Sequence, residues 1–220
     1  MKFFLDSAKV DEVKFALEYF DIDGITTNPR HVQASGKPFL KVIEEIGEMV
    51  AGTSKTVSVE VNPHFTEFEQ IIPEAEKLAR ISPNFVIKLQ CMESSMKAIP
   101  CLAQMGIRVN LTLVFSASQA LFAMRAGAYY VSPFIGWKES NGEEITSFIE
   151  EIVAMRDNYA FPTQIIVAAV RNGRQMVNAA VAGADIVTAG LAVYREALEH
   201  PYTRDGIARF TGFWDQTPYE

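Results

Sequence analysis

The sequence predicts an α/β protein folded as a single (β/α)8 barrel with a C-terminal helical tail. Short apolar runs rich in β-branched and aromatic residues alternate with amphipathic helical stretches, a pattern typical of a parallel sheet. This alternation repeats eight times in 220 residues, which matches the length of a compact α/β barrel. An open, doubly wound sheet is the alternative, but the glycine-rich phosphate loop that usually follows its first strand is absent.

Each strand and helix is predicted from a local pattern. In chain order, the expected strands are Phe3–Leu5, Gly24–Thr26, Thr56–Val61, Phe85–Leu89, Arg108–Leu113, Tyr129–Phe134, Ile165–Ala169 and Ile186–Thr188. Apolar residues at helical spacing predict helices between them at Val10–Tyr19, Phe39–Val50, Phe65–Ile81, Met96–Gln104, Ser116–Arg125, Ile145–Asn158, Gly173–Ala182 and Leu191–Glu199. Two helix-to-strand junctions carry the same Ala-Gly-Ala sequence, at Gly127 and Gly183, and a glycine there suits a left-handed helix stop.

Composition and charge indicate one soluble domain over residues 1–220, with about 200–220 as the tail. The net charge of -7 argues against nucleic acid or an anionic membrane as a partner. No apolar stretch approaches the roughly 20 residues of a membrane span, and the N-terminus is charged too early for a signal peptide. Cys91 and Cys101 match no metal spacing, so two free thiols in a reducing cytoplasm are expected.

Polar and ionisable residues end most of the predicted strands. Active sites of (β/α)8 barrels lie at the carboxyl ends of the strands. Those ends carry Asp6, Thr26, Thr27, Asn28, Glu60, Lys88, Asn110, Thr112, Ser132, Phe134 and Arg171. A core built only for packing would carry aliphatic residues there, so the pattern predicts one shared pocket.

Lys88 is the most informative of these residues because it lies inside the apolar run Phe85–Leu89. Burial disfavours the ammonium form and lowers the pKa of a lysine, which leaves a neutral amine able to attack a carbonyl. That is the requirement of an enzyme that forms a Schiff base. The alternative is a lysine at a strand end whose ammonium reaches water.

Three other strand-end residues also have purely structural explanations. Asp6 is able to cap the following helix together with Ser7. The pair Asn28-Pro29 is an ordinary turn signal, and Glu60 suits the solvated face of an edge strand. A closed barrel would instead bring all three to the same pocket.

Seven segments at these strand ends carry a family resemblance. They are Phe4–Ser7, Gly24–Pro29, Val59–Val61, Val86–Lys88, Asn110–Ser116, Ser132–Gly136 and Ala182–Asp185. Over essentially the whole chain they resemble the transaldolase and fructose-6-phosphate aldolase family of class I aldolases. The Thr-Thr-Asn-Pro and Asn-Leu-Thr-Leu-x-Phe-Ser segments are specific at this spacing.

The resemblance implies a role for each residue of the predicted pocket. Lys88 would form a Schiff base with a ketose, and Asp6 would take the proton from the hydroxyl next to the bond that breaks. Glu60 and Thr112 would hold a water between them and shuttle protons. The dihydroxyacetone unit would be bound by Thr26, Asn28, Asn110, Ser132 and Phe134. No metal or cofactor is expected, because the protonated imine is itself the electron sink.

Two positions favour a transferase over a simple aldolase. Aldolase-type members of the family carry glutamine at the position of Glu60 and tyrosine at the position of Phe134. A tyrosine phenol helps to protonate the enamine and release free dihydroxyacetone. Phe134 has no such group, so the enamine is expected to survive until a second aldehyde arrives.

Two departures from the family pattern concern the terminal anion of the substrate. Trp137 stands where typical members carry a phosphate-binding arginine, and Ala169 stands where they carry a serine, whereas Arg171 keeps the cation. A sulfonate, with a single charge, needs fewer cations than a phosphate and more neutral N–H donors. The residues assigned to this anion are Arg30, His31, Trp137, Lys138, Arg171 and Asn172.

This anion-binding set resembles the sulfofructose transaldolase branch of the family. There the donor would be 6-deoxy-6-sulfofructose, released as sulfolactaldehyde, and the acceptor would be glyceraldehyde 3-phosphate or erythrose 4-phosphate. One alternative is a fructose-6-phosphate transaldolase or aldolase in which Trp137 is only a packing change. The other is a non-catalytic barrel that binds a sugar acid, although a sensor gains nothing from a buried amine.

The expected partners are therefore small sugar substrates and other copies of the same chain. The segment Phe210–Asp215 is rich in aromatic residues and is expected to dock on a neighbouring subunit. Short members of the family exchange C-terminal helices within rings of ten, so the resemblance implies a homo-oligomer and, with it, a decamer. A tail folded back on its own barrel is the alternative.

Overall fold

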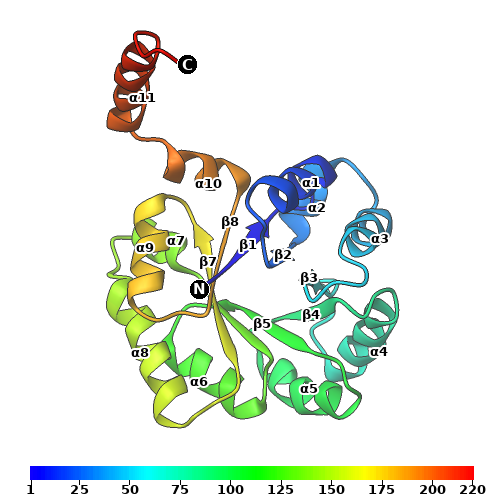
Figure 1. Ribbon diagram of the computed structural model, residues 1–220. Helices are drawn as coiled ribbons and strands as arrows, with labels where there is room; N and C mark the ends of the chain where they lie inside the picture. Colours follow the sequence, from blue (N-terminus) through cyan, green and yellow to red (C-terminus); the bar gives the residue numbers. More distant parts are fainter.

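The computed structural model describes all residues from 1 to 220 and contains a closed barrel of parallel strands (Figure 1). Each strand pairs with the next, and the last pairs with the first. The strands are β1 (Lys2–Asp6), β2 (Gly24–Thr26), β3 (Thr56–Glu60), β4 (Phe85–Gln90), β5 (Val109–Val114), β6 (Tyr130–Pro133), β7 (Gln164–Val170) and β8 (Ile186–Ala189). The predicted (β/α)8 barrel, or TIM barrel, is confirmed, and every strand begins and ends within one residue of its predicted bounds.

Helices follow the strands along the chain and surround the barrel (Figure 1). They are α1 (Val10–Tyr19), α2 (Pro29–Ser35), α3 (Phe39–Met49), α4 (Phe68–Ala79), α5 (Glu93–Gln104), α6 (Ala117–Ala126), α7 (Ile135–Ser140), α8 (Thr146–Asn158), α9 (Gly173–Val181), α10 (Leu191–Leu198) and α11 (Pro201–Trp214). The sequence pattern predicts neither α2 nor α7. With 7 and 6 residues, both are too short for apolar periodicity to mark them.

The two repeated glycines end their helices as predicted. Gly127 caps α6 with φ +86°, and Gly183 follows α9 with φ +87°. Both values lie in the left-handed region, which glycine enters without steric cost. Each chain segment then turns directly into the next strand.

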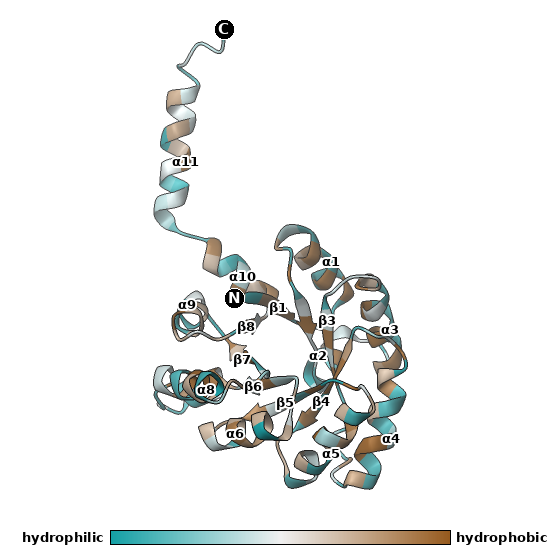
Figure 2. Cartoon of the chain, turned by 60° about the horizontal axis from the view of Figure 1, so that its bottom comes forward, coloured by the Kyte–Doolittle hydropathy of each residue, from teal (hydrophilic) through white to brown (hydrophobic).

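Apolar side chains fill the lower part of the barrel and the layer between barrel and helices. An inner cluster consists of Phe4, Val86, Tyr130, Ile166 and Ile186, from five different strands. Gly24 makes room for this cluster, because a Cβ atom there would lie 2.5 Å from the Phe4 ring. Figure 2 shows the strands mostly in the brown of apolar residues, with polar teal on the surrounding helices.

Side chains on one face of a strand recur every second residue, so the residues above the inner cluster point into the barrel as well. Lys88 lies two residues beyond Val86, and Asp6 lies two residues beyond Phe4. The barrel register then aligns neighbouring strands, pairing Asp6 with Thr26 and Lys88 with Asn110. The same interior therefore holds packing residues below and polar residues above.

Helix α11, with 14 residues, buries none of them. It extends away from the barrel beyond α10 and carries the C-terminus to the far end (Figures 1 and 2). The predicted C-terminal helical tail is therefore present, and it does not fold back on its own barrel. None of the helices combines the length and the apolar character that crossing a membrane requires.

Candidate active site

A cavity of about 520 Å³ opens at the carboxyl ends of the strands. Among its lining residues are twelve that the sequence predicts for the site: Asp6, Thr26, Asn28, Arg30, His31, Glu60, Lys88, Thr112, Ser132, Phe134, Trp137 and Arg171. Three further predicted residues, Asn110, Lys138 and Asn172, do not line it. Most of the predicted residues therefore line one cavity, and local hydrogen bonds hold the three others outside it.

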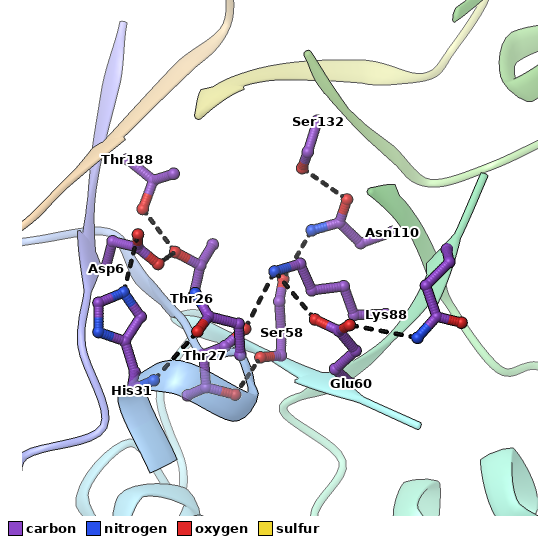
Figure 3. A network of polar contacts seen from close by, with 12 residues as sticks. Asp6, Thr26, Thr27, His31, Ser58, Glu60, Lys88, Asn110, Ser132 and Thr188 are labelled. Atoms are coloured by element: carbon purple, nitrogen blue, oxygen red, sulfur yellow. Dashed lines mark hydrogen bonds and ion pairs between the residues drawn. The ribbon is translucent and has the colours of Figure 1, made fainter. Parts of the chain in front are cut away.

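Lys88 occupies the floor of this cavity and is 3% exposed. Strand register places it beside Glu60, and its Nζ lies 3.4 Å from Glu60 Oε2. The same Nζ donates a hydrogen bond of 3.0 Å to the Thr27 carbonyl oxygen (Figure 3). The amine is therefore buried and held by two oxygens rather than extended to water. A closed barrel has no edge strand, so Glu60 faces the interior.

Asp6 receives hydrogen bonds on both of its carboxylate oxygens. Thr26 Oγ1 donates to Oδ1 at 2.7 Å, and His31 Nε2 lies 3.0 Å from Oδ2 (Figure 3). Burial raises the pKa of the Asp6 carboxyl, but the hydrogen bond and charge of His31, the charge of Lys88 and the hydrogen bond from Thr26 outweigh it and lower that pKa below its ordinary value. Asp6 does not cap α1, where Lys9 takes the cap position.

Thr188 extends the Asp6 network from the eighth strand. Its Oγ1 lies 2.6 Å from Thr26 Oγ1, and since the Thr26 hydrogen is directed to Asp6, Thr188 is the donor. Thr188 is not among the residues predicted for the site, although it ends the predicted strand Ile186–Thr188. The rule that selects the other strand ends therefore points to it as well.

A second polar chain crosses the barrel next to Lys88. Asn110 Nδ2 donates to Ser58 Oγ at 3.0 Å, and Ser132 Oγ donates to Asn110 Oδ1 at 2.7 Å. Both hydrogen bonds are buried, and Asn110 is 0% exposed. Asn110 thus lies just behind the cavity lining, where it fixes the Ser132 hydroxyl that does line it. Ser58 is not among the residues that the sequence predicts for the site.

Thr112 and Glu60 complete the floor of the cavity. Thr112 Oγ1 is buried and has no hydrogen-bond partner within the protein. A buried hydroxyl without a partner is costly, so the site favours a polar ligand atom or a water there. Glu60 Oε1 accepts a hydrogen bond of 3.3 Å from Gln90 Nε2, which leaves its other oxygen toward Lys88.

Two aromatic rings, Phe134 and Trp137, line one wall of the cavity, and both pack against Phe115. Phe134 packs edge-on against Phe115 at 5.6 Å and against Trp137 at 5.9 Å between ring centroids. Trp137 also stacks on Phe115 at 5.6 Å, yet it remains 51% exposed and lines the cavity. Gly136 allows α7 to approach β7 closely, because a Cβ atom there would lie 2.1 Å from the Ala169 carbonyl oxygen.

The predicted basic residues divide into two groups. Arg30 and Arg171 line the cavity, and the Arg171 guanidinium donates to Ser140 Oγ at the end of α7. Lys138 does not reach the cavity, because its ammonium is bonded to Glu143 and to the Phe115 carbonyl oxygen. The structure therefore does not bring Lys138 to the cavity together with the other residues assigned to the terminal anion.

Asn172 is likewise outside the cavity, because it caps helix α9. Its Oδ1 accepts a hydrogen bond of 2.9 Å from the Gln175 backbone N–H. Asn28 caps α2 in the same way, accepting from the His31 N–H at 3.0 Å, but it also lines the cavity. Asn28 is therefore a helix cap rather than part of a simple turn, and it lies at the cavity at the same time.

Two residues of the cavity have a backbone conformation that no sequence signal indicates. Leu113 and Ala169 each have φ +58°, in the left-handed region that non-glycine residues rarely adopt. Each lies at a register irregularity, between Leu111 and Val114 and between Val167 and Val170. Strained backbone of this kind gathers at functional sites, where the surrounding structure over-determines it.

Comparisons with known proteins agree with this geometry. The family model described as Transaldolase/Fructose-6-phosphate aldolase matches residues 3–216. A 6-deoxy-6-sulfo-D-fructose transaldolase of Priestia aryabhattai is 48% identical, with 100% of this chain and 98% of the relative covered. A probable transaldolase of Dictyoglomus turgidum is 41% identical, with 99% and 100% covered. Among solved structures, a thiamine phosphate pyrophosphorylase from Pyrococcus furiosus superposes with a TM-score of 0.62, covering 90% of this chain and 88% of that one. At 14% sequence identity, this similarity concerns the fold alone.

The closed barrel and the match to the family model define an enzyme of the transaldolase type. The chain belongs to the transaldolase/fructose-6-phosphate aldolase family. The family resemblance of the strand-end segments is thereby confirmed, and the relatives named for sulfofructose support the predicted branch.

Proposed function

We propose that this protein is a Schiff-base transaldolase that transfers a dihydroxyacetone unit from 6-deoxy-6-sulfofructose to an aldehyde. The observation that carries this proposal is the buried Lys88 amine, 3.4 Å from Glu60 and facing the same cavity as Asp6. A nucleophile and two carboxylates in one cavity are the groups that imine formation and carbon–carbon cleavage require. Sulfolactaldehyde is the released product, and glyceraldehyde 3-phosphate or erythrose 4-phosphate is the acceptor.

The first half of the reaction uses Lys88, Glu60 and Thr112. Glu60 first takes a proton from Lys88, and the neutral amine attacks the ketone carbon to give a carbinolamine. Glu60 then passes that proton, through a water hydrogen-bonded to Thr112, to the carbinolamine hydroxyl, which leaves as water and gives a protonated imine. The Thr112 hydroxyl supports this arrangement, because it is buried without a partner in the protein and is free to form a hydrogen bond with such a water.

Asp6 then acts on the hydroxyl of the fourth carbon. Its carboxylate takes the hydroxyl proton, the bond between the third and fourth carbons breaks, and the electron pair moves into the imine to form an enamine. The fourth carbon leaves as the aldehyde of the product. The lowered pKa of Asp6 supports this role, because only the ionised carboxylate accepts the proton.

The second half of the reaction reverses these steps with the acceptor. The enamine attacks the acceptor aldehyde, Asp6 returns the proton to the new alkoxide, and water releases the ketose from Lys88. Phe134 lines the cavity without a phenol that would protonate the enamine. Ser132, held by Asn110, binds a hydroxyl of the three-carbon unit until the acceptor arrives.

The sulfonate end of the donor is assigned to the wall formed by Trp137, Arg30 and Arg171. All three line the cavity, and the indole offers a neutral N–H while the two arginines offer charge. The 48% identity to a relative named for sulfofructose supports the same substrate. Fructose 6-phosphate remains the second candidate donor, because two arginines in the cavity also suit a phosphate.

Borohydride trapping with each donor, followed by peptide mass mapping, tests the chemistry. Reduction of the imine should leave a stable adduct on the peptide that contains Lys88 with sulfofructose. An adduct on another lysine, such as Lys55 or Lys138, would contradict the assignment. A larger adduct yield with fructose 6-phosphate at equal subsaturating concentration would favour the second candidate.

We further infer that the protein is a homo-oligomer joined through α11, with the ring of ten subunits that the family resemblance implies. The helix exposes Tyr202, Ile207, Phe210, Phe213 and Trp214 by 61–79% each. An exposed apolar surface of this kind marks an interaction site in a stable protein. A second copy of the chain is the partner that the family resemblance implies.

Light scattering of the wild type and of Phe210→Asp tests the assembly. The wild type should have the mass of a ring of subunits, and the variant should dissociate toward monomers of 24.5 kDa. Asp215→Asn, just beyond the helix, is a matched control that should leave the assembly unchanged. A monomeric wild type would contradict the inference.

A further inference from the structure

We propose that His31 is a positioning residue for Asp6, holding the carboxylate oriented and ionised for carbon–carbon cleavage, rather than a ligand of the donor's terminal anion. This inference rests on the proposed function, since it assigns a role within the same cleavage step. It changes the assignment that the sequence favours for His31.

The contact geometry supports this role. His31 Nε2 lies 3.0 Å from Asp6 Oδ2, while Thr26 Oγ1 holds Asp6 Oδ1 at 2.7 Å. With one donor on each oxygen, the carboxylate plane is fixed, because rotation about its last bond would break both hydrogen bonds. Each oxygen still has a lone pair free to accept a substrate proton.

The backbone of α2 brings the ring to this position. Strand β2 delivers Thr26 beside Asp6, and α2 begins three residues later with Pro29. Asn28 Oδ1 accepts the His31 N–H at 3.0 Å, which anchors the first turn of the helix. One short segment therefore supplies both hydrogen-bond donors of Asp6, so the carboxylate and its two partners move as a unit.

The charged and titratable groups around Asp6 explain why a second donor matters. His31 approaches from α2, Lys88 from β4, and the Tyr194 phenol from α10, where it donates to the Phe4 carbonyl oxygen. Burial raises the pKa of Asp6, and the interactions with His31 are the largest of those that lower it. Without His31 the pKa of Asp6 rises, and a larger fraction of the carboxyl is protonated at a given acidic pH.

The two possible roles of His31 predict different kinetics. A residue that binds the terminal anion changes KM for donors that carry that anion and leaves uncharged donors unaffected. A residue that positions Asp6 slows cleavage of every donor by the same factor, and it shifts the acidic limb of the pH profile upward. Imine formation on Lys88 precedes cleavage and stays unaffected.

The test compares His31→Leu and His31→Asn, which remove the donor or shorten its reach, with His31→Gln, which keeps an N–H donor at similar length. Gln33→Leu, on the exposed side of the same helix, is the matched control. Single-turnover cleavage is measured with sulfofructose, fructose 6-phosphate and fructose, together with borohydride-trapped adduct and thermal unfolding. Fructose has no terminal anion, so it separates the two roles.

We expect His31→Leu and His31→Asn to slow cleavage about 10- to 100-fold with all three donors, the usual worth of a hydrogen bond to a charged group. Adduct yield should be unchanged, the acidic limb should move to higher pH, and His31→Gln should recover most of the rate. A loss confined to the two anionic donors, or an unchanged pH profile, would overturn the inference. Absence of any wild-type adduct on Lys88 would instead refute the proposed function itself.

Discussion

Glu60 and Lys88 are register partners on neighbouring strands, and their charged groups lie 3.4 Å apart inside the barrel. The pairing gives the buried Lys88 Nζ a polar partner where water does not reach it, and a buried polar group without a partner is costly. It also places a carboxylate beside the amine that would form the imine. The same contact thus contributes to the fold and to the proposed chemistry.

Replacing Lys88 by methionine should abolish turnover and the borohydride-trapped adduct. Methionine has a similar length and suits a buried strand, so the barrel should still fold. Far-ultraviolet circular dichroism and trapping with labelled donor measure the two properties. Lys138→Met is the matched control, because that ammonium is bonded outside the cavity, and it should keep both turnover and adduct.

Replacing Asp6 by asparagine should separate imine formation from cleavage. The amide cannot accept the hydroxyl proton, so cleavage should slow by about 10²- to 10⁴-fold, the usual worth of a positioned base. The adduct on Lys88 should still form. Rapid-quench analysis of sulfolactaldehyde release measures the cleavage step, and equal loss of adduct and cleavage would argue against the role of Asp6.

The lowered pKa of Asp6 also predicts a pH dependence of stability. A carboxyl whose pKa is lower in the folded protein stabilises the fold above its unfolded pKa, and this contribution is lost as pH falls through the folded pKa. The free energy of unfolding of the wild type relative to Asp6→Asn should therefore decline below about pH 4. Urea titrations across that range provide the measurement, and a relative stability that increases in acid would contradict the shift.

The strands illustrate how much of the fold the sequence predicts. Alternation of apolar runs and helices identifies all of them, since a (β/α)8 barrel repeats one local unit. The helices that the pattern misses, α2 and α7, depend on caps and close packing, such as Asn28 on α2 and Gly136 against Ala169. The Asn28 cap is local and the Gly136 contact is tertiary, but neither alters the apolar periodicity from which helices are predicted.

The residues of the site also fall into a group that the sequence predicts and a group that it does not. Lys88, Glu60 and Asp6 are predicted by their places at strand ends, because backbone register alone brings them together. Side chains on the short helices α7 and α2 follow no such rule: Lys138 contacts Glu143, and His31 contacts Asp6. Their partners depend on which charges the folded chain brings near these helices, which a single sequence does not specify.

Replacing Phe134 by tyrosine should raise the release of free dihydroxyacetone when no acceptor is present. The added phenol would face the cavity, since the Phe134 ring already lines it, and would help to protonate the enamine. Enzyme-coupled detection of dihydroxyacetone measures the change. Unchanged or lower release would indicate that this position does not decide between transferase and aldolase behaviour.

The identity of the donor is the central claim, and the ratio of kcat/KM for sulfofructose to that for fructose 6-phosphate tests it most directly. The wild type should favour sulfofructose. The double variant Trp137→Arg and Ala169→Ser should shift the ratio toward phosphate by up to about 10²-fold, because it adds a charge-assisted and a hydroxyl donor and removes the indole N–H. A wild-type ratio that already favours fructose 6-phosphate would contradict the sulfonate assignment and support the phosphate donor instead.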